Sequence, residues 1–216
     1  ERYLKPNFSI IVDIFQGQYL SQLKCFECET TSTTYTSFST LTLHIPDHIN
    51  ANSINLEQCF DDFVKSEVLD GDDRWLCPRC KKKVKALKIT KISRLPEVLI
   101  IILKRFKMDS YLTKINNFIN YPKILKLDKY WPKIKDENER LKLSGLPLRG
   151  QLPPFNYSLF GVVNHFGGLL TGHYTSYVYK GSDYGWCYFD DDKITKRCND
   201  SKVINSNAYV LFYSRI

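Results

Sequence analysis

The sequence lacks the segments that mark membrane-spanning and secreted proteins. Its main apolar run, residues 98–103, is far shorter than the ~18 apolar residues of a membrane-spanning helix. No secretory signal pattern opens the chain. We therefore expect no membrane span and a cytoplasmic location in a reducing compartment.

The chain also lacks a dense block of one charge. It has 31 lysines and arginines against 23 aspartates and glutamates, a net charge of +8, and outside residues 81–91 the lysines are scattered. A zinc-knuckle protein that binds nucleic acid through residues 81–91 is one alternative. Because the aromatic and basic residues do not share an evident exposed face, we expect no nucleic-acid partner.

Methionine is nearly absent. Met108 is the only one, and the chain begins at Glu1 in the middle of a sequence pattern. With 216 residues, of which 43% are hydrophobic, the chain is long enough to bury a sizeable core. We therefore expect a globular monomer that is a piece of something longer.

Cysteine occurs in an odd number, and four of the seven cysteines form two Cys-x-x-Cys pairs, Cys25 with Cys28 and Cys77 with Cys80. Without a signal peptide, this pattern indicates a metal site more than disulfide bonds. Four thiolates suit a closed tetrahedral site, so we predict one structural zinc ion. The alternatives are buried free thiols and two local redox pairs.

The two cysteine pairs are far apart in the chain. The gap between them is 48 residues (77 − 28 − 1), which exceeds a compact zinc ribbon. We expect the pairs at the tips of two separate hairpins, so that zinc joins distant segments.

Hydrophobic periodicity predicts mostly antiparallel strands with few helices. Two short helices are expected, one after the cap residue Ser9 and one after Asn55, which forms a capping-box pattern with Gln58. Residues 98–103 form a continuous apolar run that predicts a central strand covered on both faces. Residues 107–154 have weak periodicity, which predicts loops with one or two short strands.

A histidine and several aspartates lie on the two arms of a predicted hairpin. His173 begins one strand, residues 181–185 turn the chain back, and Asp190 ends the next strand. A five-residue loop places Asp191 on the face of His173, whereas a bulge at Gly185 places Asp190 there. A carboxylate bonded to one imidazole nitrogen leaves the other free, as a general base requires. The alternative is an edge hairpin whose aspartates only solvate a turn.

No nucleophile accompanies this histidine in the sequence. Cys59 fits a helix core, Cys198 lies in polar sequence after the hairpin, and Cys187 alternates away from Asp190. We assign the nucleophile to none of these cysteines.

A glycine-rich loop lies between His165 and His173. Glycine has no side chain, so a substrate backbone can approach such a loop closely. The other two histidines, His44 and His48, are predicted to be ordinary surface or edge residues without a catalytic role.

The sequence contains a series of short motifs in a fixed order. They are Cys25-x-x-Cys28, Cys77-x-x-Cys80, Leu103-Lys104-Arg105-Phe106, Tyr157-x-Leu159, Asn164-His165-x-Gly167-Gly168, Gly172-His173-Tyr174 and Trp186-x-x-Phe189-Asp190-Asp191. Their joint order and spacing resembles that of the ubiquitin-specific protease family, a group of papain-like ubiquitin carboxyl-terminal hydrolases. The resemblance covers nearly the whole chain.

The resemblance implies an α+β fold of the papain-like cysteine protease kind. Residues 1–216 are expected to form part of a catalytic domain, with zinc-bearing β-hairpin fingers at about residues 16–95 and a mainly antiparallel palm at about residues 96–216. The third subdomain of the family, the thumb, is expected to be largely missing from this sequence.

The resemblance also implies roles for the hairpin residues. His173 is similar to the family's general base, and Asp190 is similar to the third member of the triad, because the family spacing places that residue 17 positions later (190 − 173). Asp191 is similar to an auxiliary polar residue.

Four further residues resemble substrate-binding positions of the family. Phe106 and Tyr174 match residues that line the channel for the C-terminal tail of ubiquitin. The loop from His165 to Gly172 resembles one that gates this channel.

The implied activity is that of a deubiquitinating thiol hydrolase, which cleaves after the C-terminal glycine of ubiquitin and acts on ubiquitinated proteins. The nucleophilic cysteine and the oxyanion asparagine are expected before Glu1, so residues 1–216 alone are expected to be inactive. The alternative is a non-catalytic ubiquitin-binding or scaffold module that retains the fold.

Overall fold

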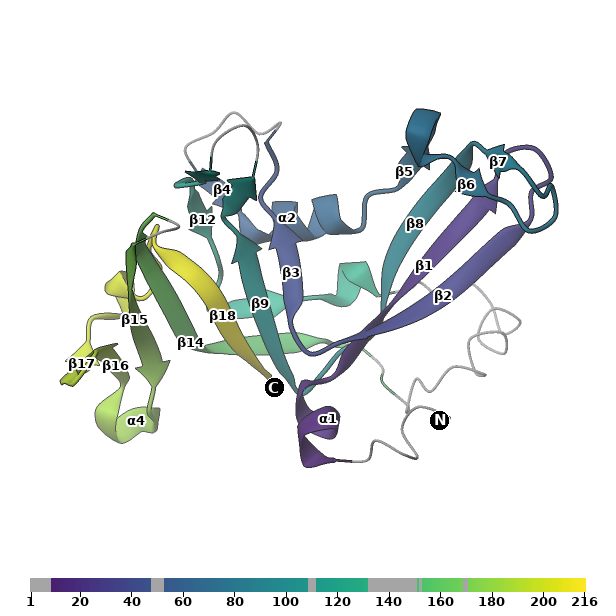
Figure 1. The fold of residues 1–216 in the computed structure, drawn as a ribbon. Coiled ribbons are helices and arrows are strands. Elements are labelled where there is room, and N and C mark those ends of the chain that lie inside the picture. Colours follow the sequence, from purple (N-terminus) through teal and green to yellow (C-terminus); the bar gives the residue numbers. More distant parts are fainter. Residues whose placement is uncertain (1–8, 48–52, 109–111, 132–150, 152, 169–170) are drawn as a thin grey trace.

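The computed structural model describes residues 9–47, 53–108, 112–131, 151, 153–168 and 171–216. Strands dominate these residues and helices are few, which confirms the predicted fold class. A broad sheet forms the body of the molecule, and a narrower sheet projects from it as an arm (Figure 1).

The broad sheet has eight strands in the order β17-β16-β15-β14-β18-β9-β3, with β13 beside β14. Neighbouring strands are antiparallel, except that β3 and β9 are parallel. The strands are β3 (Leu41–His44), β9 (Val98–Lys104), β13 (Ile124–Lys126), β14 (Asn156–Gly167), β15 (Gly172–Tyr179), β16 (Trp186–Asp190), β17 (Lys193–Cys198) and β18 (Ala208–Arg215).

The arm is a four-stranded antiparallel sheet in the order β2-β1-β8-β5. A two-stranded hairpin, β6-β7, lies at its far end (Figure 1). The strands are β1 (Gly17–Cys25), β2 (Thr31–Phe38), β5 (Glu67–Leu69), β6 (Trp75–Leu76), β7 (Lys83–Val84) and β8 (Ala86–Arg94). The strand β3, which follows β2 in the chain, leaves the arm and joins the broad sheet.

Two further strand pairs and several short helices complete the described residues. The strand pairs are β4 (Ser53–Asn55) with β12 (Phe118–Asn120), and β10 (Phe106–Met108) with β11 (Leu112–Lys114). The helices are α1 (Ile10–Phe15), α2 (Leu56–Phe63) and α4 (Gly181–Tyr184), and the 3₁₀ turns are η1 (Gly71–Asp73), η2 (Asp128–Tyr130) and η3 (Asp200–Lys202).

Both helix starts predicted from the sequence are confirmed. At α1 the Ser9 hydroxyl accepts hydrogen bonds from the backbone N–H groups of Ile11 and Val12, at 3.2 and 3.4 Å. At α2 the backbone N–H of Asn55 donates to the Gln58 side-chain oxygen at 2.7 Å. Each contact satisfies a polar group that the start of a helix leaves without an intrahelical partner.

The apolar run at residues 98–103 forms the strand β9, but its predicted central place is wrong. β9 lies between β18 and β3, so a single strand separates it from the edge of the sheet. Its alternate side chains Leu99, Ile101 and Leu103 are fully buried in the core. The intervening side chains, on the other face of β9, are half-buried. The run is therefore apolar throughout without being central.

The segment from residue 107 to residue 154 contains more regular structure than predicted. Strands β11, β12 and β13 and most of β10 lie in it, against an expectation of one or two short strands. Residues 132–150, including the polar stretch there, lie outside the described residues. Strands of three residues leave too little alternation for a sequence pattern to reveal.

Among the described residues, one charged side chain is fully buried. Arg105 is fully buried, and burial lowers the pKa of its guanidinium. Its Nε donates to the Ala208 carbonyl at 2.7 Å, and one terminal nitrogen donates to the carbonyls of Ile115 and Asn117 at 2.9 and 3.0 Å. This side chain therefore joins the end of β9, the segment after β11 and the start of β18.

We predict that truncation of β9 destabilises the fold. Ile101→Ala removes buried methyl and methylene groups, so the free energy of unfolding should fall by about 2–5 kcal/mol. Chemical denaturation followed by tryptophan fluorescence measures it. The matched control is Ile194→Ala on β17, whose side chain is 57% exposed. The control should change stability by about 0.5 kcal/mol or less, and equal effects of the two substitutions would contradict the described core.

Candidate functional site

The hairpin of β15 and β16 brings a histidine and a carboxylate into contact. His173 is the second residue of β15 and Asp190 is the last residue of β16. The Nε2 atom of His173 lies 2.6 Å from Oδ1 of Asp190. This distance indicates a short, charge-assisted hydrogen bond between the two side chains.

The register of this hairpin decides between the two aspartates that the sequence left open. Tyr179 pairs with Trp186, and Ser176 pairs with Phe189. The short helix α4 and Gly185, whose φ is +59°, form the connection between the strands. With this register Asp190 projects from the same face of the sheet as His173.

The carboxylates around His173 favour its protonated form. The hydrogen bond to Asp190, followed by the charges of Asp190 and Asp191, raises the pKa of His173, and burial opposes this only in part. The pairing therefore stabilises the folded state fully below the ordinary histidine pKa of about 6.5. This stabilisation is lost as the pH rises through the higher folded-state pKa.

Asp191 lies beside the pair of His173 and Asp190 and forms part of the turn between β16 and β17. Its backbone φ is +50°, which begins the reversal from β16 into β17. Side-chain ligand atoms of His173, Asp190 and Asp191 all lie within 4.8 Å of one another. Asp191 therefore acts on the imidazole through its charge, whereas Asp190 holds it by a hydrogen bond.

A cluster of rings lies next to this hairpin and contains three of the four predicted substrate-binding residues. The His165 ring centroid is 5.4 Å from that of Phe106 and 4.7 Å from that of Tyr174. Tyr209 lies 5.9 Å from Phe106 and 6.0 Å from His165. The His165 side chain is buried, whereas Tyr174 is 54% exposed.

The fourth residue, Gly172, lies so close to this cluster that no side chain fits. A Cβ atom on Gly172 would lie 2.2 Å from Nε2 of His165 and 2.9 Å from the Phe166 carbonyl oxygen. The glycine is therefore required by the close approach of β15 to the His165 ring. The structure brings together all the hairpin and ring residues that the sequence singled out.

Sequence reasoning missed Tyr209. It lies in an apolar strand pattern near the end of the chain, and no motif marks it. Its place in the ring cluster follows from the pairing of β18 with β14, which joins distant segments.

The seven cysteines are all described, and none lies in hydrogen-bond contact with His173. Cys59 is buried in the core, and burial raises the pKa of its thiol to about 12. Cys187 and Cys198 point their sulfurs at the carbonyls of Tyr184 and Thr195. The remaining four cysteines meet at the far end of the arm.

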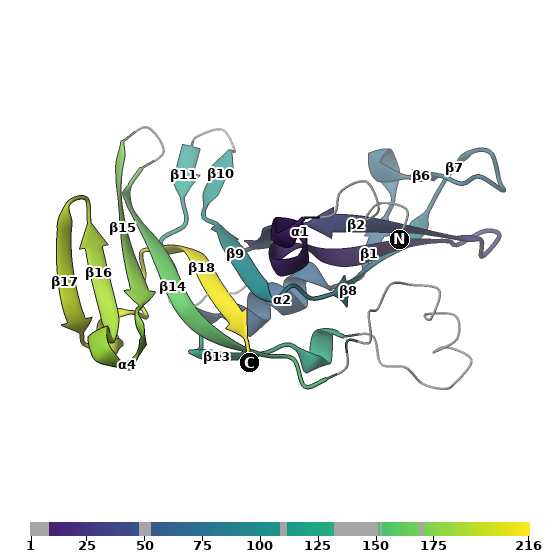
Figure 2. The ribbon, with the colours of Figure 1, turned by 90° about the horizontal axis from the view of Figure 1, so that it is seen from below.

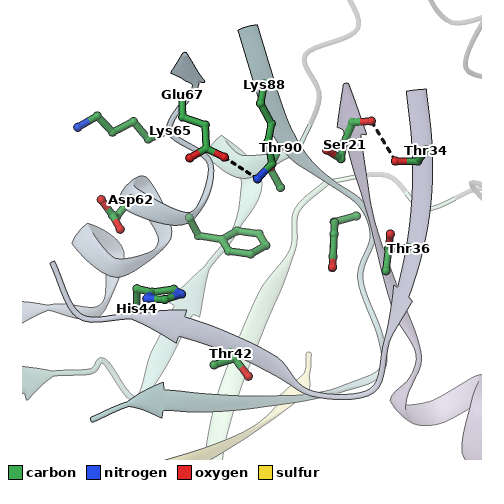
Figure 3. Close-up of a pocket in the computed structure, with 12 residues that line it drawn as sticks. Ser21, Thr34, Thr36, Thr42, His44, Asp62, Lys65, Glu67, Lys88 and Thr90 are labelled. Atoms are coloured by element: carbon green, nitrogen blue, oxygen red, sulfur yellow. Dashed lines mark hydrogen bonds and ion pairs between the residues drawn. The ribbon is translucent and has the colours of Figure 1, made fainter. Parts of the chain in front are cut away.

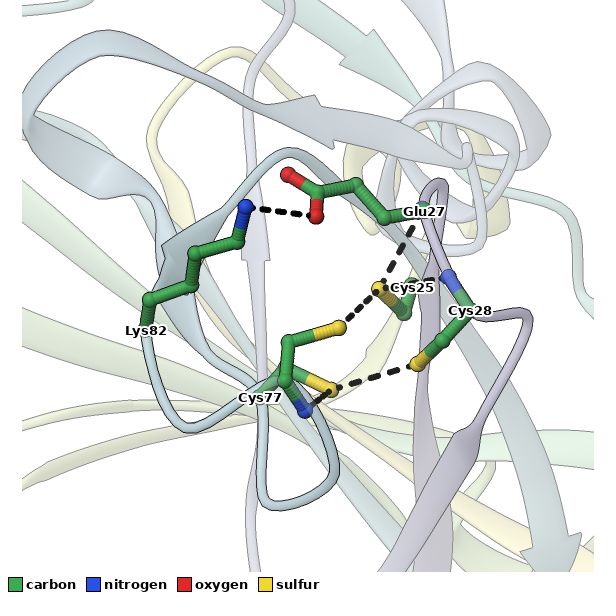
Figure 4. Close-up of polar contacts among 6 residues, drawn as sticks. Cys25, Glu27, Cys28, Cys77 and Lys82 are labelled. Carbon is green, nitrogen blue, oxygen red and sulfur yellow. Dashed lines mark hydrogen bonds and ion pairs between the residues drawn. The ribbon is translucent and has the colours of Figure 1, made fainter.

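These four cysteines form one cluster in space (Figure 4). Cys25 ends β1, and Cys77 and Cys80 lie in the turn between β6 and β7. The Sγ atoms of Cys28 and Cys77 are 3.6 Å apart, and those of Cys25 and Cys80 are 3.9 Å apart. The two pairs therefore come from two separate hairpins, as their spacing in the sequence indicated.

The geometry of the cluster fits a tetrahedral metal ion. Metal–sulfur bonds of about 2.3 Å give sulfur–sulfur edges of about 3.8 Å, close to the observed separations. Backbone N–H groups of Glu27 and Cys28 point at the Cys25 sulfur, at 3.3 and 3.4 Å, and the N–H of Cys80 points at the Cys77 sulfur at 3.4 Å. These contacts favour thiolate, the form that binds metal.

A groove lies between the arm and the body of the molecule (Figure 3). Its volume is about 570 Å³, and it is lined by side chains of β1, β2, β3, β5, β8 and α2 and by Lys65 after α2. Asp62 and Glu67 contribute carboxylates to it, Lys88 contributes an ammonium group, and His44 lies at its floor. A smaller cavity of about 340 Å³ adjoins His44 and Phe106. The exposed His44, which the sequence analysis left without a role, thus borders both.

Among the described residues, no helix is long and apolar enough to cross a membrane.

Comparison with known proteins identifies a family. The family model described as ubiquitin carboxyl-terminal hydrolase matches residues 1–213. Ubiquitin carboxyl-terminal hydrolase 4 of Saccharomyces cerevisiae (strain YJM789) is 49% identical over 225 residues, and Usp2 of Drosophila melanogaster is 31% identical over 215 residues. Both alignments cover the whole chain, which spans only 23% and 21% of the length of these relatives.

Solved structures with the same fold are also known. A chain in the SAGA Ubp8/Sgf11/Sus1/Sgf73 DUB module bound to ubiquitin aldehyde matches with a TM-score of 0.77 and 29% identity, over 97% of this chain and 43% of that chain. A chain in a yeast SAGA DUB module matches with a TM-score of 0.78 and 27% identity, over 100% of this chain and 45% of that chain. The predicted papain-like α+β fold is therefore confirmed.

We predict that Asp190→Asn lowers the pKa of His173 toward its ordinary value of about 6.5, because the substitution removes the carboxylate whose hydrogen bond and charge stabilise the imidazolium. An NMR titration of the His173 ring protons measures the midpoint. Asp192→Asn is the control, since Asp192 is exposed and no pKa shift of His173 depends on it. An unchanged midpoint in Asp190→Asn would contradict the pairing.

Proposed function

The chain belongs to the ubiquitin carboxyl-terminal hydrolase family, and we propose that the protein is a deubiquitinating thiol hydrolase in which His173 is the general base and Asp190 its orienting partner. The observation that carries this proposal is the 2.6 Å contact between His173 Nε2 and Asp190 Oδ1. The match of residues 1–213 to the family model confirms the family that the sequence motifs indicated.

The contact assigns separate tasks to the two imidazole nitrogens. Asp190 accepts a hydrogen bond from Nε2–H, which fixes the tautomer and leaves Nδ1 to face a cysteine thiol. Nδ1 takes the thiol proton, and the thiolate attacks the carbonyl carbon after the last glycine of ubiquitin. The imidazolium then donates the proton to the leaving amine. Water, deprotonated by the same Nδ1, hydrolyses the acyl-enzyme.

The nucleophile is supplied by a segment other than residues 1–216. In support, four of the seven cysteines form the cluster at the end of the arm. Cys59 is buried, with a pKa raised to about 12, and such a thiol is a poor nucleophile. The sulfurs of Cys187 and Cys198 turn toward backbone carbonyls.

The substrate is ubiquitin joined through its C-terminal glycine to a protein. The relatives are ubiquitin carboxyl-terminal hydrolases, and one structural neighbour is bound to ubiquitin aldehyde. The groove of about 570 Å³ between arm and body receives part of the ubiquitin surface. Phe106, His165, Gly172 and Tyr174 form a wall for its tail, and the absence of a side chain at Gly172 suits a narrow glycine tail.

We further propose that Cys25, Cys28, Cys77 and Cys80 hold one structural zinc ion. In support, the sulfur–sulfur separations of 3.6 and 3.9 Å fit a tetrahedral site. The ion joins the turn after β1 to the β6-β7 hairpin. Buried Val84 and partly buried Trp75 are the only apolar side chains besides the cysteines in the described core of this tip. The tip therefore depends on the metal for its order.

The activity is tested with the full-length protein and a fluorogenic ubiquitin C-terminal substrate. His173→Ala removes the base, so kcat should fall by about 100- to 10,000-fold. Asp192→Ala is the control and should retain activity. Residues 1–216 alone should give no turnover, and turnover by this segment would contradict the assignment of the nucleophile to another segment. Ubiquitin binding by the full-length protein without any turnover would favour the non-catalytic alternative.

The zinc site is tested by metal analysis of the purified protein. We expect one zinc per chain, and we expect Cys77→Ser to lose it and to disorder the tip, because zinc binding contributes about 10–16 kcal/mol in small zinc-dependent peptides. Cys198→Ser is the matched control, since Cys198 lies outside the cluster, and it should retain the metal. Protein that is metal-free at neutral pH and still ordered at the tip, by hydrogen exchange of residues 74–86, would refute the site.

A further inference from the structure

At its C-terminal end the strand β14 lies between β15 and β18, and it extends beyond β18. Its pairing with β18 ends where Asn164 faces Ala208, whereas its pairing with β15 continues to Gly167 opposite Gly172. Residues 165–167 therefore have a strand on one side only. We call these three residues the β14 overhang.

The open side of the β14 overhang presents backbone carbonyls. The N–H of His165 points to this side and donates to the Asn207 carbonyl at 2.9 Å. In an extended strand the N–H and C=O of one residue point to the same side, and so do those of the residue two positions on. The carbonyls of His165 and Gly167 thus face the side where β18 has ended.

Lys114 binds the carbonyls that β18 does not reach. Its ammonium group donates to the His165 carbonyl at 2.7 Å and to the Gly167 carbonyl at 3.0 Å. Figure 2 shows the hairpin of β10 and β11, which carries Lys114, standing beside the hairpin of β14 and β15. One side chain therefore joins two hairpins that no described strand pairing connects.

The backbone next to Lys114 is held by two hydrogen bonds to Arg105. The residue after it, Ile115, donates its N–H to the Arg105 carbonyl at 2.7 Å and accepts from the Arg105 side chain at 2.9 Å. Lys114 is half-buried, and this burial, followed by the nearby charge of Arg105, lowers its pKa. By contrast, Lys88 reaches an exposed carboxylate of Glu67 at the surface. Lys114 is therefore held by specific hydrogen bonds, unlike a solvated lysine at the surface.

The two carbonyls flank the residue opposite the proposed base. His165 and Gly167 lie on either side of Phe166, and Phe166 pairs across the hairpin with His173. The ring of His165 packs against Phe106 and Tyr174. A contact that fixes the backbone of the β14 overhang therefore fixes both the strand that carries His173 and one side of the ring cluster.

We infer that Lys114 is a positioning residue of the active site, which clamps the β14 overhang so that the His173 strand and the ring cluster are aligned before substrate binds. This inference rests on the proposed function. Lys114 touches neither His173 nor the reacting atoms, and acts through the backbone of residues 165–167.

The clamp predicts a particular kinetic signature. Without it, only a fraction of the free protein has the aligned overhang, and substrate binding must select that fraction. The apparent affinity then falls by the same fraction, while the saturated complex retains its rate. Loss of a pair of hydrogen bonds from a charged group corresponds to a change of about tenfold.

The test compares three variants of the full-length protein in steady-state kinetics with a fluorogenic ubiquitin substrate. Lys114→Met should raise KM about tenfold and leave kcat within about twofold. Lys114→Arg should restore most of the affinity, because a guanidinium also donates to two carbonyls. Lys126→Met, an exposed lysine on β13, should match the unmodified protein. An unchanged KM in Lys114→Met, or a lower kcat with unchanged KM as from partial unfolding, would overturn the inference.

Hydrogen exchange tests the clamp without reference to turnover. In Lys114→Met the amides of His165 and Gly168 should exchange about tenfold faster, whereas Lys126→Met should leave them unchanged. Unchanged exchange in Lys114→Met overturns the clamp. If the unmodified protein turns over no ubiquitin substrate, the proposed function fails, and exchange still decides whether Lys114 holds the overhang.

Discussion

The buried guanidinium of Arg105 is the interaction on which the functional half of the fold depends. A buried cation is costly unless its hydrogen-bond donors are satisfied. Here three backbone carbonyls from two distant segments accept from Nε and one terminal nitrogen, whereas the other terminal nitrogen is buried without a hydrogen-bond partner in the described residues. Arginine keeps its charge in such a site because its ordinary pKa is far above neutrality. Three side chains at or beside the candidate site adjoin these contacts in sequence. Phe106 follows Arg105 itself, Lys114 precedes Ile115, and Tyr209 follows Ala208.

This arrangement explains what sequence alone could and could not predict. The cysteine pairs, the helix caps and the hairpin of His173 depend on residues close in the chain or on strong ligand chemistry, and their patterns are visible in the sequence. The choice of Asp190 over Asp191 depended on whether Tyr179 or Lys180 pairs with Trp186, a shift of one residue that reverses every side chain. No propensity distinguishes the two registers.

The features that the sequence did not reveal are all products of long-range pairing. Tyr209 joins the ring cluster because β18 lies between β14 and β9. Lys114 meets the His165 carbonyl because β14 is longer than β18 at one end, and strand lengths in three dimensions leave no periodic signal. The apolar run of β9 suggested a central strand because its side chains are buried on one face and half-buried on the other. In each case tertiary contact determined the outcome.

The charge state of the hairpin also bears on how the two parts of the active site meet. The carboxylates raise the pKa of His173, so the base carries a proton more often than an isolated histidine does. A thiol that approaches this imidazolium loses its own proton more readily, because the positive charge stabilises the thiolate. In the mechanism we propose, the favoured state of the assembled pair is therefore thiolate with imidazolium, and Asp190 supplies the charge that favours it. A neutral histidine without this carboxylate would need to take the proton during the attack itself. In that mechanism the 2.6 Å contact favours transfer of the proton before the bond-forming step.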